Sequence, residues 1–259
     1  MASLDMDSFA GALKQHYTSE KIENMVYKDN PFLAMVSKYE DFGGINLKLP
    51  IKYGIPQGRS ATFADAKENA TASQYEAFLL TRVKNYCIAY IDNETLEASK
   101  GNANAFIEAA TNEIDGAIES ITRSLAIGLF GDGSGAIGQL PATGYSSTDV
   151  SFTLQTIQDV TNFEIGMSLV TAAATTGAET STAEGIVSAV NRDTGVITYA
   201  PAFAGTSAND DYVFPEGDLS ASAGTANIKM ISGLNGWVPS TAPGTTAFFG
   251  VDRSVDVTR

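Results

Sequence analysis

The chain has 259 residues, with 30 aspartate and glutamate residues against 16 lysine and arginine residues, which gives a formal net charge of −14. This charge repels nucleic acid at long range and disfavours direct DNA or RNA readout, although plain solubility is its commonest role. No run of about 18 apolar residues occurs, so the sequence predicts no transmembrane helix. The length allows one large domain or two smaller ones, and an apolar share of 44% is enough for a real core.

The first 40 residues read as an N-terminal arm that is helical with interruptions. Apolar residues recur with partly helical spacing over Ser8–Tyr39. Asn30-Pro31 stops or bends this pattern, and Pro31 suits the first turn of a second short helix.

Residues 41–91 read as a long hairpin-like loop with its strands. Ile45–Leu49 alternates and predicts a strand, whereas Pro50 argues against its continuation. Arg59–Ser73 is small and polar and predicts the tip of the loop. The return limb, Tyr75–Ile91, alternates again, with apolar groups on both sides. This segment has too few large apolar residues for a core of its own, so we expect it to bury surface on a neighbouring molecule.

The single cysteine, Cys87, excludes an intramolecular disulfide framework. It lies in an apolar strand-like context without a nearby histidine or arginine. We interpret it as a small buried residue and not as a reactive thiol.

Residues 92–135 contain the strongest helical pattern. Apolar residues recur at steps of three and four over Asn102–Phe130, Ser99 or Asn102 can cap its start, and glycines from Gly131 end it. The helix carries acidic residues with few bases beside them: Glu108, Glu113, Asp115 and Glu119. These acids form either a solvated face or partners for Arg59, Lys67 or Arg82 of a neighbouring subunit.

Small residues and short strand-like runs dominate the chain after Gly131. The expected strands are Ser151–Leu154, Ser168–Ala172, Gly185–Asn191, Gly195–Tyr199 and Asp211–Phe214. Asn191–Gly195 is a tight turn between two of them. We therefore expect a small β-barrel or sandwich over 148–218. In the last segment, 219–259, Ala221–Trp237 reads as an apolar loop with a short helix.

Residues that carry chemistry are few and scattered. The only histidine is His16, which leaves almost nothing for a histidine-metal site or a catalytic triad. Gly131–Gly135 lacks a lysine and follows a helix, so it reads as a helix stop and not as a phosphate loop. Asn209–Asp211 lacks the twelve-residue calcium pattern and reads as a polar turn. We expect no catalytic, cofactor or metal site, and an enzyme is the class that the sequence supports least.

The order of these segments resembles the major capsid proteins of tailed phages with the HK97-type fold. The resemblance is carried by Leu47–Gly54, Gly58–Ala66, Tyr75–Ser99 and the helix Asn102–Phe130. It implies an α+β, HK97-like capsid fold with an N-terminal arm, an extended E-loop hairpin, the spine helix of a peripheral domain and a β-barrel-like insertion domain. It implies no enzyme activity and no cofactor.

The resemblance also implies a function and partners. The chain would form pentamers and hexamers of an icosahedral virion shell, assembled in the host cytoplasm, which encloses DNA without sequence-specific binding and involves no membrane. Portal, scaffold or decoration proteins would be further partners. Arg59, Phe63 and Lys67 on the E-loop would contact the next subunit.

Two features depart from the family pattern. Only Ile228–Arg259 follows the insertion, which is too short for a full axial domain, so we expect the chain to be a piece of a longer protein. Lys67 is the one candidate for the family's lysine–asparagine cross-link near the tip. No matching asparagine can be placed, and we expect no cross-link.

Two other functions stay open on the sequence. An encapsulin-like shell of a cellular nanocompartment has the same fold. A β-rich binding module or adhesin would use residues 148–218 as its working part and the helix as a stalk.

Overall fold

The computed structural model describes residues 31–37, 39, 42–90, 103–219 and 229–255. It is a mixed α+β structure with a curled antiparallel β-sheet and few helices. The chain divides into two compact units, one drawn from Met1–Ser37 and Lys84–Trp237 and the other from Lys38–Val83 and Val238–Arg259. His16, the proposed caps Ser99 and Asn102, and the helix expected before Pro31 lie outside the described residues.

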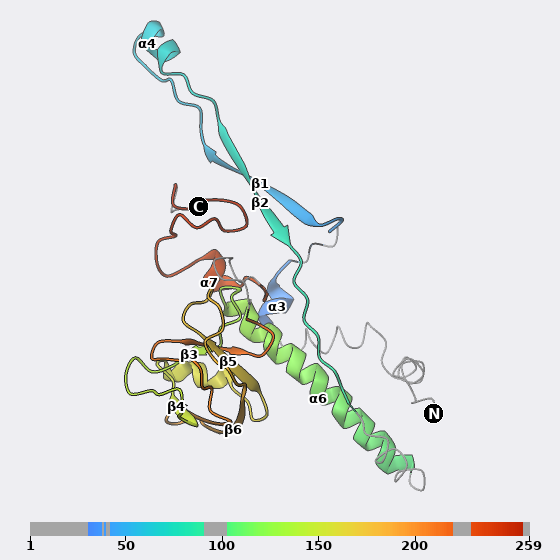
Figure 1. Cartoon of the computed structure of the whole chain (residues 1–259). Helices are drawn as coiled ribbons and strands as arrows, with labels where there is room; N and C mark the ends of the chain where they lie inside the picture. The colour runs from blue at the N-terminus through green and yellow to red at the C-terminus, as the bar shows by residue number, and fades with distance from the viewer. Residues whose placement is uncertain (1–30, 38, 40–41, 91–102, 220–228, 256–259) are drawn as a thin grey trace. The chain divides into compact units, whose positions relative to one another are not determined.

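The second unit contains a two-stranded antiparallel hairpin. Strand β1 (Asn46–Gly54) pairs with β2 (Gln74–Thr81), and the short helix α4 (Phe63–Glu68) lies at the far end of this hairpin (Figure 1). Pro50 was expected to end the first strand, but β1 continues through it, and Pro50 lies opposite Ala77 in the ladder. A strand with a single neighbour tolerates proline because the missing N–H can face away from the ladder.

The return limb is shorter than predicted. β2 ends at Thr81, and no strand is assigned to residues 82–90. Our interpretation of Cys87 as a buried residue is therefore wrong, since its side chain is exposed. Outside a sheet, the alternation of apolar residues in Tyr86–Tyr90 does not bury one side of the chain.

A small apolar cluster closes the base of the hairpin. The ring of Phe78 lies edge-on to that of Phe248 at 6.5 Å, and the Leu79 N–H donates to the Phe249 carbonyl at 2.8 Å. The Arg253 guanidinium lies 4.0 Å from the centre of the Phe248 ring. Among the described residues of this unit, Phe78 and Val251 are the buried apolar side chains. The outer part of the hairpin therefore has no core of its own.

In the first unit, the predicted long helix is confirmed as α6 (Ala103–Phe130), with 28 residues. It ends as expected at Gly131, whose N–H donates to the carbonyls of Ile127 and Gly128. Helix α3 (Pro31–Met35) starts at the predicted proline, and Phe32 packs against Phe130 with ring centres 5.3 Å apart. Helix α7 (Leu234–Trp237) is the short helix expected near the end of the chain.

The six-stranded sheet of this unit has the order β3-β8-β5-β6-β7-β4, with every pair antiparallel. Its elements are β3 (Gly138–Gln139), β4 (Ser151–Thr153), the 3₁₀ helix η2 (Ile157–Asn162), β5 (Ser168–Ala172), β6 (Gly185–Asn191), β7 (Val196–Ala200) and β8 (Tyr212–Pro215). The sheet is curled, and the Gln155 N–H, shortly after β4, donates to the Gln139 carbonyl of β3 at 3.1 Å. We refer to this curled sheet as the barrel. The five predicted strands are present, and the sequence patterns missed β3 and η2.

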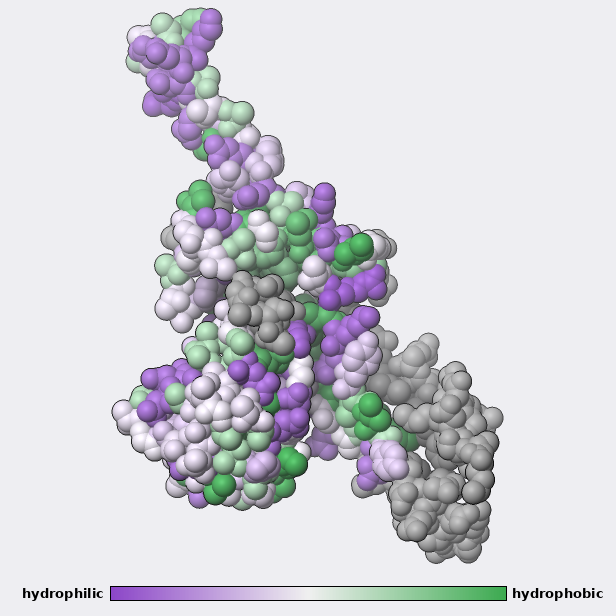
Figure 2. Space-filling model, in the orientation of Figure 1, coloured by the Kyte–Doolittle hydropathy of each residue, from purple (hydrophilic) through white to green (hydrophobic). Residues whose placement is uncertain are grey.

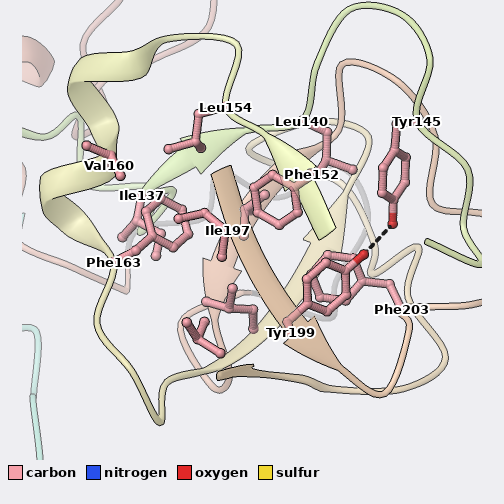
Figure 3. Packing of buried hydrophobic residues seen from close by; sticks show 13 residues of the cluster. Ile137, Leu140, Tyr145, Phe152, Leu154, Val160, Phe163, Ile197, Tyr199 and Phe203 are labelled. Atoms are coloured by element: carbon pink, nitrogen blue, oxygen red, sulfur yellow. Dashed lines mark hydrogen bonds between the residues drawn. The ribbon is translucent and has the colours of Figure 1, made fainter. Parts of the chain in front are cut away.

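Aromatic rings fill the barrel (Figure 3). Tyr199 and Phe203 stack with ring centres 4.3 Å apart, and Phe152 contacts both of them as well as the fully buried Phe163. The hydroxyls of Tyr145 and Tyr199 lie 3.1 Å apart, and Tyr199 also donates to the Asp149 carbonyl at 2.8 Å. Burial raises the pKa of the Tyr199 hydroxyl, which stays protonated as a donor.

Gly185 is the position in the barrel where a side chain would collide most directly with this core. An added Cβ would lie 2.7 Å from the ring of Phe203 and closer still to that of Tyr199. We expect Gly185→Ala to lower the free energy of unfolding by about 1–3 kcal/mol, because packed rings cannot move without strain. Urea unfolding measures this change. Gly116→Ala on α6 is the matched control, since nothing lies within 4 Å of its added Cβ, and it should raise helix stability slightly. Equal effects at the two glycines would contradict the described packing.

Candidate subunit interface

The hairpin tip, residues 55–73, is organised by its own hydrogen bonds. Thr62 caps α4: its hydroxyl donates to the Asp65 carboxylate at 2.6 Å and accepts from the Asp65 N–H at 3.4 Å. Across the base of the tip, the Gln57 N–H donates to the Thr71 hydroxyl and the Thr71 N–H to the Gln57 carbonyl, both at 3.0 Å. The sequence pattern predicted a loop here and not the helix, although Thr62 and Asp65 have capping-box spacing.

The three predicted contact residues are all exposed on this tip. Phe63 is 85% exposed, Arg59 and Lys67 are exposed, and α4 contains no buried residue. Phe63 and Lys67 are four residues apart on α4, so they share one face of the helix. The segment is ordered by its own hydrogen bonds and buries no side chain of α4, so Phe63 and Lys67 are accessible to a partner.

Charge is distributed very unevenly between the hairpin and the rest of the chain. From Asn46 to Arg82 there are five basic and three acidic residues, and every one of the five bases is exposed. The bases are Lys48, Lys52, Arg59, Lys67 and Arg82. In the space-filling view, hydrophilic residues predominate at the end of the hairpin, with weakly hydrophobic ones between them (Figure 2).

The opposite balance holds in the helix–barrel body, residues 103–219. It contains fifteen acidic residues and two arginines. The acids are Glu108, Glu113, Asp115, Glu119, Asp132, Asp149, Asp159, Glu164, Glu179, Glu184, Asp193, Asp210, Asp211, Glu216 and Asp218. Its surface is therefore strongly negative, and it attracts a basic segment such as the hairpin over roughly one Debye length, about 10 Å at 0.1 M salt.

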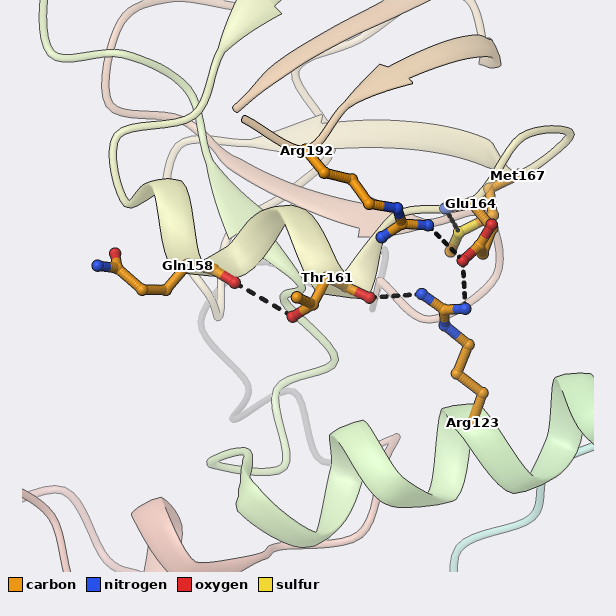
Figure 4. A network of polar contacts seen from close by, with 6 residues as sticks. All are labelled: Arg123, Gln158, Thr161, Glu164, Met167 and Arg192. Atoms are coloured by element: carbon orange, nitrogen blue, oxygen red, sulfur yellow. Dashed lines mark hydrogen bonds and ion pairs between the residues drawn. The ribbon is translucent and has the colours of Figure 1, made fainter. Parts of the chain in front are cut away.

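Both arginines of this body bind the same carboxylate (Figure 4). Arg123 of α6 forms an ion pair with Glu164 and donates to the Thr161 carbonyl at 2.5 Å. Arg192, at the end of β6, reaches the same Glu164 oxygen at 2.8 Å. Ile127, one turn after Arg123, packs against the barrel core. These contacts attach the barrel to α6.

Of the predicted helix acids, Glu113, Asp115 and Glu119 are exposed on α6, and Glu108 lies in its first turns. Their pairing with Arg59 or Lys67 of a neighbour stays a prediction. The sequence did not predict the ion pairs of Arg123 and Arg192 with Glu164. Residues 103–219 contain only two arginines among fifteen acidic residues. This imbalance indicates that both arginines form ion pairs, but it does not indicate with which acid.

Glu164 gives the attachment of the barrel a pH dependence. Burial raises the pKa of its carboxyl, but the hydrogen bond from Arg192 and the charges of Arg123 and Arg192 outweigh this, and the pKa lies below its ordinary value of 4.5. A lowered pKa stabilises the folded state above pH 4.5, and this stabilisation is lost as the pH falls through the folded-state value.

We therefore expect Glu164→Gln to lower the free energy of unfolding by about 1 kcal/mol at pH 7, since the three side chains are partly exposed and solvent screens them. The difference from the unsubstituted protein should shrink as the pH falls below 4.5 and vanish once Glu164 is protonated in the folded state. Thermal unfolding across this pH range provides the measurement. Glu184→Gln, on the same barrel but bonded to Ser168 and no arginine, is the control. A difference that persists at low pH would exclude the ion pairs as its cause.

Other chemistry is sparse in the part of the chain that the structure describes. Within it, no group of three or more histidine, cysteine, aspartate or glutamate side chains could hold a metal ion. The polar turn at Asn209–Asp211 serves the barrel: the buried Asp211 carboxylate accepts from the Thr180 hydroxyl at 2.7 Å and the Ala208 N–H at 3.1 Å. No helix among the described residues is both long and apolar enough to span a membrane.

Comparison of the chain with protein-family models, with curated proteins and with solved structures found no match.

Proposed function

We propose that this chain is the major capsid protein of a tailed phage, with an HK97-type fold. It assembles into pentamers and hexamers of an icosahedral shell in the host cytoplasm and remains in the virion. Its role is structural, without catalysis or a cofactor. The α+β architecture, an antiparallel hairpin followed along the chain by the 28-residue helix α6 and then a barrel, is consistent with this fold.

One observation carries the proposal: an ordered hairpin with an excess of basic residues, whose tip buries no side chain, on a chain whose remaining described mass is strongly acidic. An isolated two-stranded hairpin is marginally stable in water. Its tip nonetheless has a capped helix and a defined set of hydrogen bonds. A partner surface explains why such a segment exists, and the acidic body of a second copy has the complementary charge.

Contact between the hairpin of one copy and the body of the next joins two different surfaces. Such head-to-tail contacts close into rings when the rotation between copies allows it. Each copy then both gives and receives one hairpin, and the interface is repeated around every ring. Stable interfaces bury about 1,200–2,000 Å² in total. Other surfaces of the two copies can contribute to this area together with the hairpin.

The helix–barrel body supplies rigidity in this arrangement. The edge strands of the barrel, β3 and β4, have only two and three residues, and such short edges offer little template for unwanted pairing. The barrel is attached to α6 through Arg123 and Ile127, so the helix and the barrel act as one rigid part of the subunit.

The negative charge also suits the contents of a shell. A net charge of −14 opposes adhesion to packed DNA, whose phosphates are negative as well. The shell encloses its genome without reading the sequence.

Sedimentation velocity of the full-length protein at several salt concentrations tests the proposal. We expect assemblies of many copies, which form more slowly at about 1 M salt than at 0.1 M because screening weakens the attraction between hairpin and body. A monomer at every protein and salt concentration would rule the proposal out.

A further inference from the structure

Residues 84–90 form an extended segment of the first unit that belongs to no sheet. The segment follows β2 along the chain and runs beside α6 (Figure 1). The Asn85 side chain donates to the Ser124 hydroxyl of α6 at 2.8 Å. Asn85, Tyr86 and Cys87 also line a groove of about 720 Å³ between α6 and the barrel. The segment therefore contacts α6 through its side chains.

The backbone of this segment is not paired with any strand. Within the part of the chain that the structure describes, residues 84–90 form no backbone–backbone hydrogen bond. An extended segment with free N–H and C=O groups is a template to which another strand can add through main-chain hydrogen bonds. The segment is also long enough for this, because an ordinary strand has about 5–6 residues.

The side chains of the segment alternate between α6 and solvent. Asn85 contacts α6 and Ala89 is half-buried, whereas three large apolar side chains are 76–77% exposed. The exposed side chains are Tyr86, Ile88 and Tyr90. A second strand that adds to the segment places its own side chains beside these three and removes part of their exposure.

The described strands of the first unit do not supply a partner for this segment. The edge strands of the barrel, β3 and β4, have two and three residues and already pair with β8 and β7. A partner of matching length therefore comes from elsewhere, and the segment itself, in a second copy of the chain, has a suitable pattern.

The segment is self-complementary in an antiparallel register centred on Cys87. In this register, Tyr86 lies opposite Ile88 of the second copy, and Lys84 lies opposite Tyr90. Pairs of an aromatic and a β-branched side chain are among the favourable cross-strand neighbours. The ammonium group of a lysine is likewise attracted to the face of a tyrosine ring.

Charge allows a second copy to approach this segment. The chain has a net charge of −14, so most surfaces of two copies repel each other. Residues 84–90 contain one charged side chain, Lys84, and no acid. In the antiparallel register the two lysines are separated by six residues along the strands, which is roughly 20 Å. This separation exceeds the Debye length of about 10 Å at 0.1 M salt, so the paired segments do not repel each other.

We propose that residues 84–90 are a strand-addition site that pairs antiparallel with the same residues of a second copy, with Cys87 at the two-fold axis. Both copies contribute the same surface to such a contact. The contact differs from the head-to-tail contact of the hairpin. The inference goes beyond the proposed shell function, because the pairing is expected whether or not shells form.

Cysteine cross-linking tests the pairing. Directly opposite Cα atoms in antiparallel strands lie about 4.5–5.5 Å apart, which is within the range that a disulfide spans. We expect oxidation of the dilute full-length protein with diamide to convert most of it into a dimer linked through Cys87, seen on non-reducing gels. Cys87→Ser should abolish this dimer.

Two cysteine variants in the Cys87→Ser background test the register. Lys84→Cys copies and Tyr90→Cys copies should each stay monomeric on oxidation, because the like positions lie roughly 20 Å apart in the dimer. A mixture of the two variants should form a dimer, because position 84 faces position 90 of the other copy. Equal yields from the mixture and from each variant alone would indicate random collision and overturn the proposal.

The exposed apolar side chains provide a separate test. Ile88→Lys should slow cross-linking through Cys87 at least tenfold, because it replaces an apolar contact with Tyr86 by a charge. Ile165→Lys is the matched control, since Ile165 is 70% exposed and lies outside the segment. Both isoleucines are exposed, so neither change should lower the unfolding temperature. Equally fast cross-linking in the two variants would contradict the pairing.

Strand pairing and shell assembly can fail separately. Shells without a cross-link through Cys87 would overturn the pairing and leave the shell proposal standing. A dimer linked through Cys87 in a protein that forms no shells would support the pairing and overturn the shell proposal. A Cys87 that neither cross-links nor reacts with a maleimide would show that something else covers the segment, and the pairing would be overturned as well.

Discussion

Replacing Arg59–Ser73 by a short glycine–serine turn is expected to abolish shell assembly while the remaining protein stays folded. The replaced segment contains α4 and no buried residue, and the β1–β2 ladder and the barrel do not depend on it. Loss of about 3 kcal/mol at each subunit contact corresponds to a more than 100-fold weaker interaction. Because the contact is repeated around a ring, this loss prevents closure of the shell.

Size-exclusion chromatography and circular dichroism measure the two parts of this expectation. The deletion variant should elute as small species and keep the thermal unfolding transition of the barrel. A matched variant that keeps α4 but changes Ser73→Ala outside it should assemble normally. Undiminished assembly of the deletion variant would show that the hairpin tip is not the contact between subunits.

Phe163→Ala is expected to cause the largest loss of stability among single substitutions in the barrel. Phe163 is fully buried, contacts Phe152 with ring centres 6.3 Å apart, and fills the space beside Gly138. Removing a buried phenylalanine ring costs about 3–5 kcal/mol, from lost burial and from the cavity that remains. This is a large share of the 5–15 kcal/mol that stabilises a typical domain.

Urea unfolding followed by tyrosine and tryptophan fluorescence measures this loss. Phe63→Ala, the same change at a side chain that is 85% exposed, is the matched control and should leave the unfolding midpoint nearly unchanged. It should instead weaken assembly. Similar stability losses in the two variants would contradict the different burial of the two rings.

The sequence predicted the regular elements well where the pattern was long or bounded by turns. The 3.6-residue repeat of α6 and the terminal glycine at Gly131 defined that helix, and the turn at Asn191–Gly195 defined the β6–β7 pair. β3 was not predicted, because a strand of two residues is too short to show an alternating pattern. Its place in the sheet is determined by long-range pairing with β8.

The sequence did not predict the features that depend on contacts between distant parts of the chain. The alternation of apolar residues around Cys87 predicted a buried strand. A strand is buried only where it pairs within a sheet, and β2 ends at Thr81, so Cys87 is exposed. The shared carboxylate of Glu164 joins Arg123 of α6 to Arg192 in the turn after β6, and these two arginines are far apart along the chain. The groove beside α6 likewise appears only when residues from distant parts of the chain are brought together.

Negative-stain electron microscopy of the purified full-length protein tests the shell proposal most directly. The proposal predicts closed, uniformly sized shells built from rings of five and six copies. Monodisperse single molecules, at concentrations where a capsid protein would assemble, would contradict it, and the barrel would then become the part of the chain in which to search for a binding function.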